Sequence, residues 1–140
     1  MCSDSQTSQS HVLIIDYWEN MLGELVALVL QRKRGDRTYL VVGGDKGLQA
    51  VQEEPPDAVF IYLWAHDPDG LDFCRQIRKM PRTEHLPVIV WGAKAPSEIY
   101  PELRDAGATG YLYQPCGPDE ILAARDIALK GGTYFPSDES

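Results

Sequence analysis

Five short apolar runs alternate with segments of helical periodicity along this chain. The first run, residues 11–16, is continuously apolar and rich in β-branched side chains, which is typical of a buried parallel strand. The other runs of this kind are residues 38–42, 58–63, 87–91 and 111–113. Their shortness predicts strands and not helices.

Each run is followed by a segment in which apolar residues recur with the period of a helix. The predicted helices cover residues 19–33, 46–53, 71–80, 96–106 and 118–130. The residues expected on the buried face of the first helix are Leu22, Leu25, Val26 and Val29. Asp45 is the expected N-cap of the second helix, and Gly107 the expected end of the fourth. Five strand-then-helix units predict an α/β fold: a doubly wound, five-stranded parallel sheet with helices on both faces.

A length of 140 residues predicts a single domain with short tails. The Ser-rich residues 1–10 are expected to be disordered, and residues 11–132 to form the domain. Residues 133–140 are expected to be a tail, or the start of a linker to an output domain that this chain lacks.

The net charge of −8 argues against direct binding to nucleic acid, which requires a basic surface. We see no signal peptide and no apolar stretch of membrane-spanning length, so we expect a cytoplasmic location without membrane contact. Cys2, Cys74 and Cys116 have neither the number nor the spacing of a disulfide framework or a zinc site.

Ligand chemistry in an open parallel sheet lies at the carboxyl ends of its strands. Four segments there resemble, in order, the receiver domain of two-component response regulators. They are Asp16 with the strand before it, residues 57–70 ending in Asp-Pro-Asp-Gly, residues 86–93 and residues 107–115. The resemblance spans nearly all of residues 11–132. It implies a flavodoxin-like sheet with strand order 2-1-3-4-5.

Receivers accept a phosphoryl group on an aspartate after the third strand, with help from acidic magnesium ligands, a hydroxyl side chain and a lysine. The residues at the corresponding positions here are Tyr62 as acceptor, Tyr17 beside the retained Asp16, Gly92 and Gln114. Phosphoryl transfer depends on positioning and charge neutralisation, so these departures predict a degenerate phosphoacceptor pocket. A phenol is almost wholly protonated at neutral pH and is a poor substitute for the acceptor. We therefore expect no catalytic residues, no bound metal, no cofactor and no enzymatic activity.

Aromatic residues gather at the same edge of the predicted sheet. Trp18, Trp64, Trp91 and Tyr113 join Tyr17 and Tyr62 there. One interpretation is that aromatic bulk fills the vacated pocket, and the other is a binding site for a planar small molecule or a partner protein. Asp16 is expected to make hydrogen bonds near the first strand in preference to binding a metal. Asp67 and Asp69 are expected to form turns and helix caps.

The resemblance also assigns roles outside the pocket. Tyr111 matches the aromatic residue that switches position in receivers, and the Gln114–Pro115 peptide bond is implied to be cis. A homodimer or a partner protein is expected to use the face formed by residues 97–106, 111–113 and 118–130. The end of the chain resembles the junction before the DNA-binding domain of NarL-class regulators.

These observations favour a domain that acts in signal transduction or transcription regulation through protein interaction, independently of phosphorylation. The alternative is a small-molecule sensor that binds its ligand at the aromatic edge.

Overall fold

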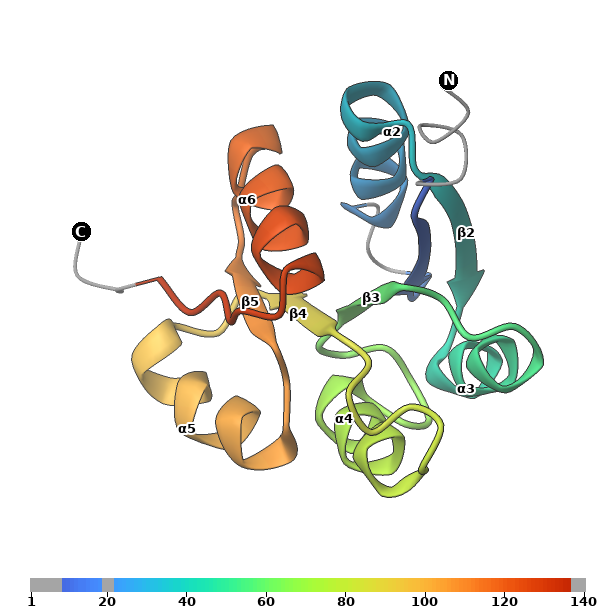
Figure 1. Cartoon of the computed structure of the whole chain (residues 1–140). Helices are drawn as coiled ribbons and strands as arrows, with labels where there is room; N and C mark the ends of the chain where they lie inside the picture. Colours follow the sequence, from blue (N-terminus) through green and yellow to red (C-terminus); the bar gives the residue numbers. More distant parts are fainter. Residues whose placement is uncertain (1–8, 19–21, 137–140) are drawn as a thin grey trace.

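The computed structural model describes residues 9–18 and 22–136, which form a three-layer α/β sandwich (Figure 1). The five strands form one parallel sheet in the order β2-β1-β3-β4-β5. The strands are β1 (His11–Asp16), β2 (Arg37–Val42), β3 (Ala58–Tyr62), β4 (Val88–Gly92) and β5 (Gly110–Tyr113). The helices are α2 (Leu22–Arg34), α3 (Gly44–Glu53), α4 (Gly70–Lys79), α5 (Pro96–Ala106) and α6 (Pro118–Leu129). The predicted fold class and strand order are confirmed.

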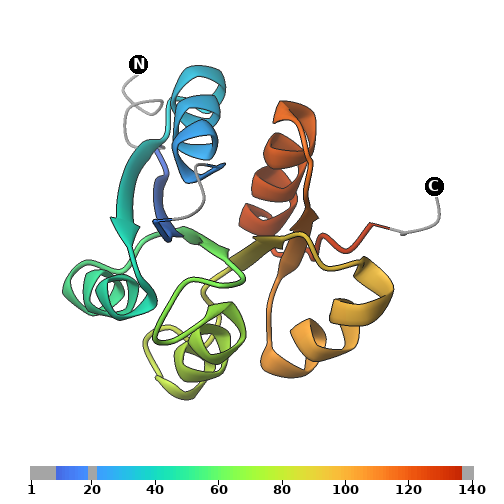
Figure 2. The ribbon, with the colours of Figure 1, turned by 180° about the vertical axis from the view of Figure 1, so that it is seen from behind.

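The helices divide between the two faces of the sheet (Figures 1 and 2). On one face α2 and α6 pack on a core that includes Phe60 and Trp91. On the other face α3, α4 and α5 pack on a core that includes Val59 and Ile61. Alternate residues of β3 thus serve opposite cores, as the period of two in a strand requires. Burial on both faces explains why the central strands are apolar throughout.

Charged side chains join α2 to α6 across the first of these faces. The Asp36 side chain, which follows α2 and has 0% exposure, accepts bonds from Arg125 Nε at 2.9 Å and Nη2 at 2.6 Å. Asp126 accepts two bonds from Arg34, at 3.0 and 2.6 Å. Forked guanidinium–carboxylate pairs of this kind fix orientation as well as adding energy. They tie together two helices that are about ninety residues apart in sequence.

Two local predictions about helices were wrong. Helix α3 begins at Gly44, with Gly43 and not Asp45 at its N-cap. Its start is set by tertiary contact, because the Gly44 N–H donates to the His66 carbonyl at 2.7 Å. Leu25 was placed on the buried face of α2 but is 38% exposed, since the helix rests on Val26, Val29 and Leu30. The predicted start of this helix at residue 19 lies outside the described residues.

Other helix ends follow the sequence rules. The Asp69 carboxylate accepts a 2.9 Å bond from the Asp72 N–H and caps α4, as predicted. Gly107 ends α5 with φ of 93°, a left-handed conformation that glycine adopts without strain. No helix in the described ranges has the length and apolar character needed to cross a membrane.

The sheet gains a short extension after α6. Tyr134 pairs with Gly110 in a parallel bridge on the outer edge of β5, and Phe135 packs against the second core. The packed part of the chain therefore continues past the predicted boundary at residue 132. At the other end, the Ser10 carbonyl accepts a 2.9 Å bond from the Arg37 N–H, while residues 1–8 of the predicted tail lie outside the described residues.

Candidate functional site

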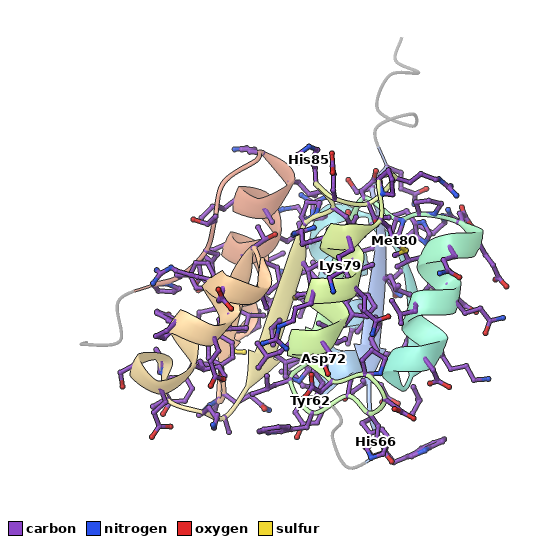
Figure 3. The ribbon with its side chains drawn as sticks, turned by 90° about the horizontal axis from the view of Figure 1, so that it is seen from below. Tyr62, His66, Asp72, Lys79, Met80 and His85 are labelled. Atoms are coloured by element: carbon purple, nitrogen blue, oxygen red, sulfur yellow. The ribbon has the colours of Figure 1, made fainter. Side chains whose placement is uncertain are left out.

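The carboxyl ends of the strands meet at one end of the molecule. Tyr62 pairs with Trp91 of β4, and Gly92 pairs with Tyr113 of β5. In Figure 3, Tyr62 lies at the same end as His66 of the β3–α4 loop, while His85 lies at the opposite end. The fold therefore brings the predicted pocket residues to one edge, although they come from distant parts of the sequence.

Asp16 ends β1 and binds the start of α2. It is only 4% exposed, and its carboxylate accepts a 2.7 Å bond from the Tyr17 N–H and a 2.8 Å bond from the Gly23 N–H. Burial raises the pKa of this carboxyl, and the two N–H bonds oppose that rise. Asp16 thus satisfies an otherwise unpaired N–H in the first turn of α2, which is the hydrogen-bonding role we predicted.

Gly23 is the hydrogen-bond partner of Asp16, and it was not predicted from the sequence. A Cβ at Gly23 would lie 2.5 Å from the Asp16 Oδ2 atom. Only glycine lets the helix backbone approach the carboxylate this closely. A glycine near the start of a helix was visible in the sequence. That it makes room for a carboxylate could be recognised only once the position of the Asp16 side chain was known.

The donor set at this edge does not fit a magnesium ion. Magnesium prefers carboxylate and other oxygen ligands in a near-octahedral arrangement. Both Asp16 oxygens are engaged by backbone N–H groups, and the neighbouring positions offer phenol rings from Tyr17 and Tyr62. Among the described residues, no group of three or more His, Cys, Asp or Glu side chains could hold a metal.

The aromatic residues of this edge stack in pairs. Tyr17 stacks on His66, with ring centroids 5.0 Å apart and planes inclined by 16°. Tyr62 stacks on Trp91 at 5.9 Å and 30°. These offset geometries are favourable for aromatic rings and leave each ring covering another. The pairing favours the interpretation that aromatic bulk fills the space.

Trp91, which we named as a possible contact for a ligand or a partner, is buried. Its side chain has 0% exposure, because it points into the core between the sheet and α6. Within the described residues its indole N–H is buried with no hydrogen-bond partner, which costs on the order of 1–3 kcal/mol. Trp18 and Trp64 are 77% and 47% exposed, so they alone of the tryptophans are accessible to a partner.

Tyr111 points inward and packs close to Gly92. Its side chain is 1% exposed, and its hydroxyl donates a 2.8 Å bond to the Lys94 carbonyl. A Cβ on Gly92 would lie 3.2 Å from this hydroxyl oxygen. Burial raises the pKa of the Tyr111 phenol, so it stays protonated and donating. The missing side chain of Gly92 thus leaves room for the inward tyrosine.

Gln114 is partly exposed beyond the end of β5. Its backbone N–H donates a 2.8 Å bond to the Gly92 carbonyl. The following Gln114–Pro115 peptide bond is cis, as the resemblance implied. A second cis bond, Asp67–Pro68, was not predicted, and Asp67 adopts a positive φ of 58° in that turn.

The strand order, the helices on both faces of the sheet and the site at the carboxyl edge are those of a receiver-type α/β domain. The chain belongs to the response regulator receiver domain family, whose model matches residues 12–126. It is therefore a receiver domain of two-component signalling. Receiver domains generally act as signal transducers that contact partner proteins.

Curated relatives are longer than this chain. The DNA-binding response regulator MtrA of Mycobacterium tuberculosis (strain H37Rv) is 27% identical over 132 residues, which is 94% of this chain and 56% of MtrA. The transcriptional regulatory protein KdpE of the same strain is 34% identical over 100 residues, or 71% of this chain and 43% of KdpE. The chain thus spans about half the length of these relatives.

Solved structures share the fold. A response regulator of Chloroflexus aurantiacus J-10-fl superposes with a TM-score of 0.81 at 27% identity, over 88% of this chain and 99% of that one. A LuxR-family response regulator of Aurantimonas sp. SI85-9A1 also reaches 0.81, at 20% identity over 94% of this chain and 91% of that one. The second match speaks for the fold alone.

Proposed function

We propose that this receiver domain signals without phosphorylation, through contacts with other proteins. The observation that carries the proposal is the state of the acceptor edge: Tyr62 stands at the position that the resemblance assigns to the phosphoryl acceptor, and both Asp16 oxygens are already bonded. An edge with a phenol at the acceptor position, and with its one predicted carboxylate already bonded, is poorly suited to hold magnesium or to neutralise the transferred group.

The inward position of Tyr111 fits this proposal. The Tyr111 hydroxyl bonds to the Lys94 carbonyl and packs close to Gly92. Its position is therefore set by packing and by whatever binds the adjacent surface. In this proposal, binding of another protein provides the signal that phosphorylation provides in other receivers.

The partner surface we propose is the face formed by α5, β5 and α6. Tyr113 and Ile127 are 47% and 37% exposed on two of these elements, so both side chains are available to a partner. A second copy of the chain or a different protein would bind there. The negative net charge makes direct DNA binding by this domain unfavourable.

The longer relatives suggest the setting. MtrA is a DNA-binding response regulator and KdpE a transcriptional regulatory protein, and in both cases this chain matches only part of the length. We propose that this domain likewise contributes to transcription control, with DNA contact made by another domain or by a partner. The site residues Asp16, Tyr17, Tyr62, Gly92 and Gln114 then act as a structural edge and not as a reaction centre.

Small-molecule sensing is the weaker candidate. Trp64 lines a shallow hollow of about 410 Å³ in the β3–α4 loop, whereas Tyr111 and Tyr113 line a different hollow of about 330 Å³. The aromatic side chains therefore do not share one cavity. A ligand site built from all of them would require rearrangement of the stacked pairs.

A native mass spectrum recorded before and after treatment with acetyl phosphate and Mg²⁺ tests the main proposal. We expect no gain of a phosphoryl mass, and the same spectrum reports whether the chain is a monomer or a dimer. A phosphoryl gain that maps to Tyr62 or Asp16 would refute the proposal. The Tyr62→Phe variant is the matched control, because it removes only the phenol oxygen.

A further inference from the structure

The outer edge of β5 is occupied by the chain's own residues 133–136. The Tyr134 N–H donates to the Thr109 carbonyl at 2.9 Å, and the Tyr111 N–H donates to the Tyr134 carbonyl at 3.0 Å. The segment leaves α6 and passes β5 on the way toward α5 (Figures 1 and 2). The segment forms one parallel bridge with β5 and is held by main-chain hydrogen bonds of the kind used in β-augmentation.

Gly110 forms a notch that admits this segment. A Cβ at Gly110 would lie 2.7 Å from the Tyr134 carbonyl oxygen and 2.9 Å from the Tyr134 Cβ. Any larger residue at position 110 would push the segment off the sheet edge. The edge is therefore shaped for close approach of an extended backbone.

Two side chains of α5 anchor the residues that follow. The Phe135 ring meets Tyr100 edge-on at 5.2 Å, and the Arg104 guanidinium lies over the Phe135 ring at 4.6 Å. The Tyr100 hydroxyl donates to the Pro136 carbonyl. Edge-to-face and cation–π contacts both require an aromatic ring at this place, so the anchor selects for one.

The connection to α6 is short and built from glycine. Gly131 has φ of 91°, and the N–H groups of Gly131 and Gly132 donate to the Ala128 and Ile127 carbonyls, so a glycine C-cap turns the chain off the helix toward β5. Beside the docked segment lies the hollow of about 330 Å³, lined by Tyr113 and Pro115 after β5, by Tyr100 of α5, and by Tyr134 and Pro136 of the segment itself. This hollow therefore offers space for a longer or differently placed segment next to the edge that residues 133–136 occupy.

We propose that the β5 edge is a docking groove for an extended peptide segment that carries two adjacent aromatic residues followed by proline, and that residues 133–136 fill it in cis. A partner protein that binds this groove presents such a segment and displaces the resident one. An intramolecular occupant acts at a millimolar effective concentration, so the resident segment sets a threshold for partner access.

The groove occupies part of the face that we propose for partners, but its existence does not rest on the absence of phosphorylation. The proposal of the groove and the proposal of phosphorylation-independent signalling can therefore be refuted independently. Acetyl phosphate chemistry tests one, and peptide competition in its absence tests the other.

The experiment uses the full chain and a synthetic peptide with the sequence of residues 131–140. In the Phe135→Ala variant, which loses the ring that Tyr100 and Arg104 hold, we expect amide hydrogen exchange at Tyr111 and Tyr134 to quicken by about tenfold. The peptide, added to millimolar concentration, should then shift the NMR signal of the Tyr111 amide in this variant far more than in the unaltered chain.

Three controls make the result specific. Tyr39→Ala removes an exposed aromatic residue from the opposite edge strand β2 and should leave the Tyr111 amide unchanged. A peptide with alanine in place of Phe135 should bind far more weakly, and adding Arg104→Ala to the Phe135→Ala chain should weaken binding of the normal peptide by roughly threefold to thirtyfold. Exchange in Phe135→Ala no faster than in Tyr39→Ala, or the absence of peptide binding to Phe135→Ala, would overturn the proposal.

Discussion

A methyl group added at Gly23 would collide with the Asp16 carboxylate. The Cβ would lie 2.5 Å from Asp16 Oδ2, the same atom that accepts the Gly23 N–H bond at 2.8 Å. Crowding of this kind costs roughly 1–3 kcal/mol, and losing a bond to a charged acceptor costs about 1.5–3 kcal/mol. Alanine recovers up to ~1 kcal/mol over glycine in a helix. We expect Gly23→Ala to lower the free energy of unfolding by about 2–4 kcal/mol.

Urea unfolding of four proteins separates the cause from a general effect of the substitution. They are the unaltered chain, Gly23→Ala, Asp16→Ala and the double variant. Asp16→Ala removes the Oδ2 atom at 2.5 Å but leaves the Cβ of residue 16 at 3.1 Å from the added methyl. Gly23→Ala should therefore cost at least about 1 kcal/mol less in the Asp16→Ala background than in the unaltered chain. An equal loss from Gly23→Ala in both backgrounds would refute the reasoning, because the collision with Asp16 would then not be its source.

Two further predictions concern the charged tie between α2 and α6. Arg125→Ala leaves the buried Asp36 carboxylate without its forked partner, so urea unfolding should show a loss of about 3–5 kcal/mol; a loss no larger than that of the exposed Arg75→Ala would contradict this. The hydrogen bond from Arg34 is the main cause that lowers the pKa of Asp126 from 3.8 to about 2. A lowered folded-state pKa gives stability that is present above the unfolded value and lost as pH falls through the folded one. The stability gap between the unaltered chain and Asp126→Asn should therefore shrink as pH falls from 3.8 toward 2, and a constant gap would speak against the assignment.

The strand ends that form the site were predictable, because strands follow from the local pattern of apolar residues. The apolar runs mark the strands, and a parallel sheet brings the carboxyl ends of its strands together whatever the side chains are. Asp16, Tyr62 and Gly92 could thus be placed at one edge before the structure was known. The cap of α4 by Asp69 followed from residue type in the same way.

The orientation of side chains at that edge was not predictable. Trp91 and Trp64 look alike in the sequence, yet one is fully buried and the other is 47% exposed. The difference arises because Trp91 lies within β4 on the α6 side, while Trp64 follows β3 in a loop. The start of α3 depends on a contact between Gly44 and His66, which are 22 positions apart.

The sequence by itself determined the fold class, the strand order by resemblance, and the identity of the residues at the strand ends. These features rest on periodicity and on local backbone preference, both of which act over a few residues. Tertiary structure decided that Asp16 binds α2, that Trp91 is core, and that residues 133–136 close the β5 edge. Such outcomes depend on which surfaces meet in the folded protein. The local pattern of a sequence does not specify contacts between residues that are far apart in the chain.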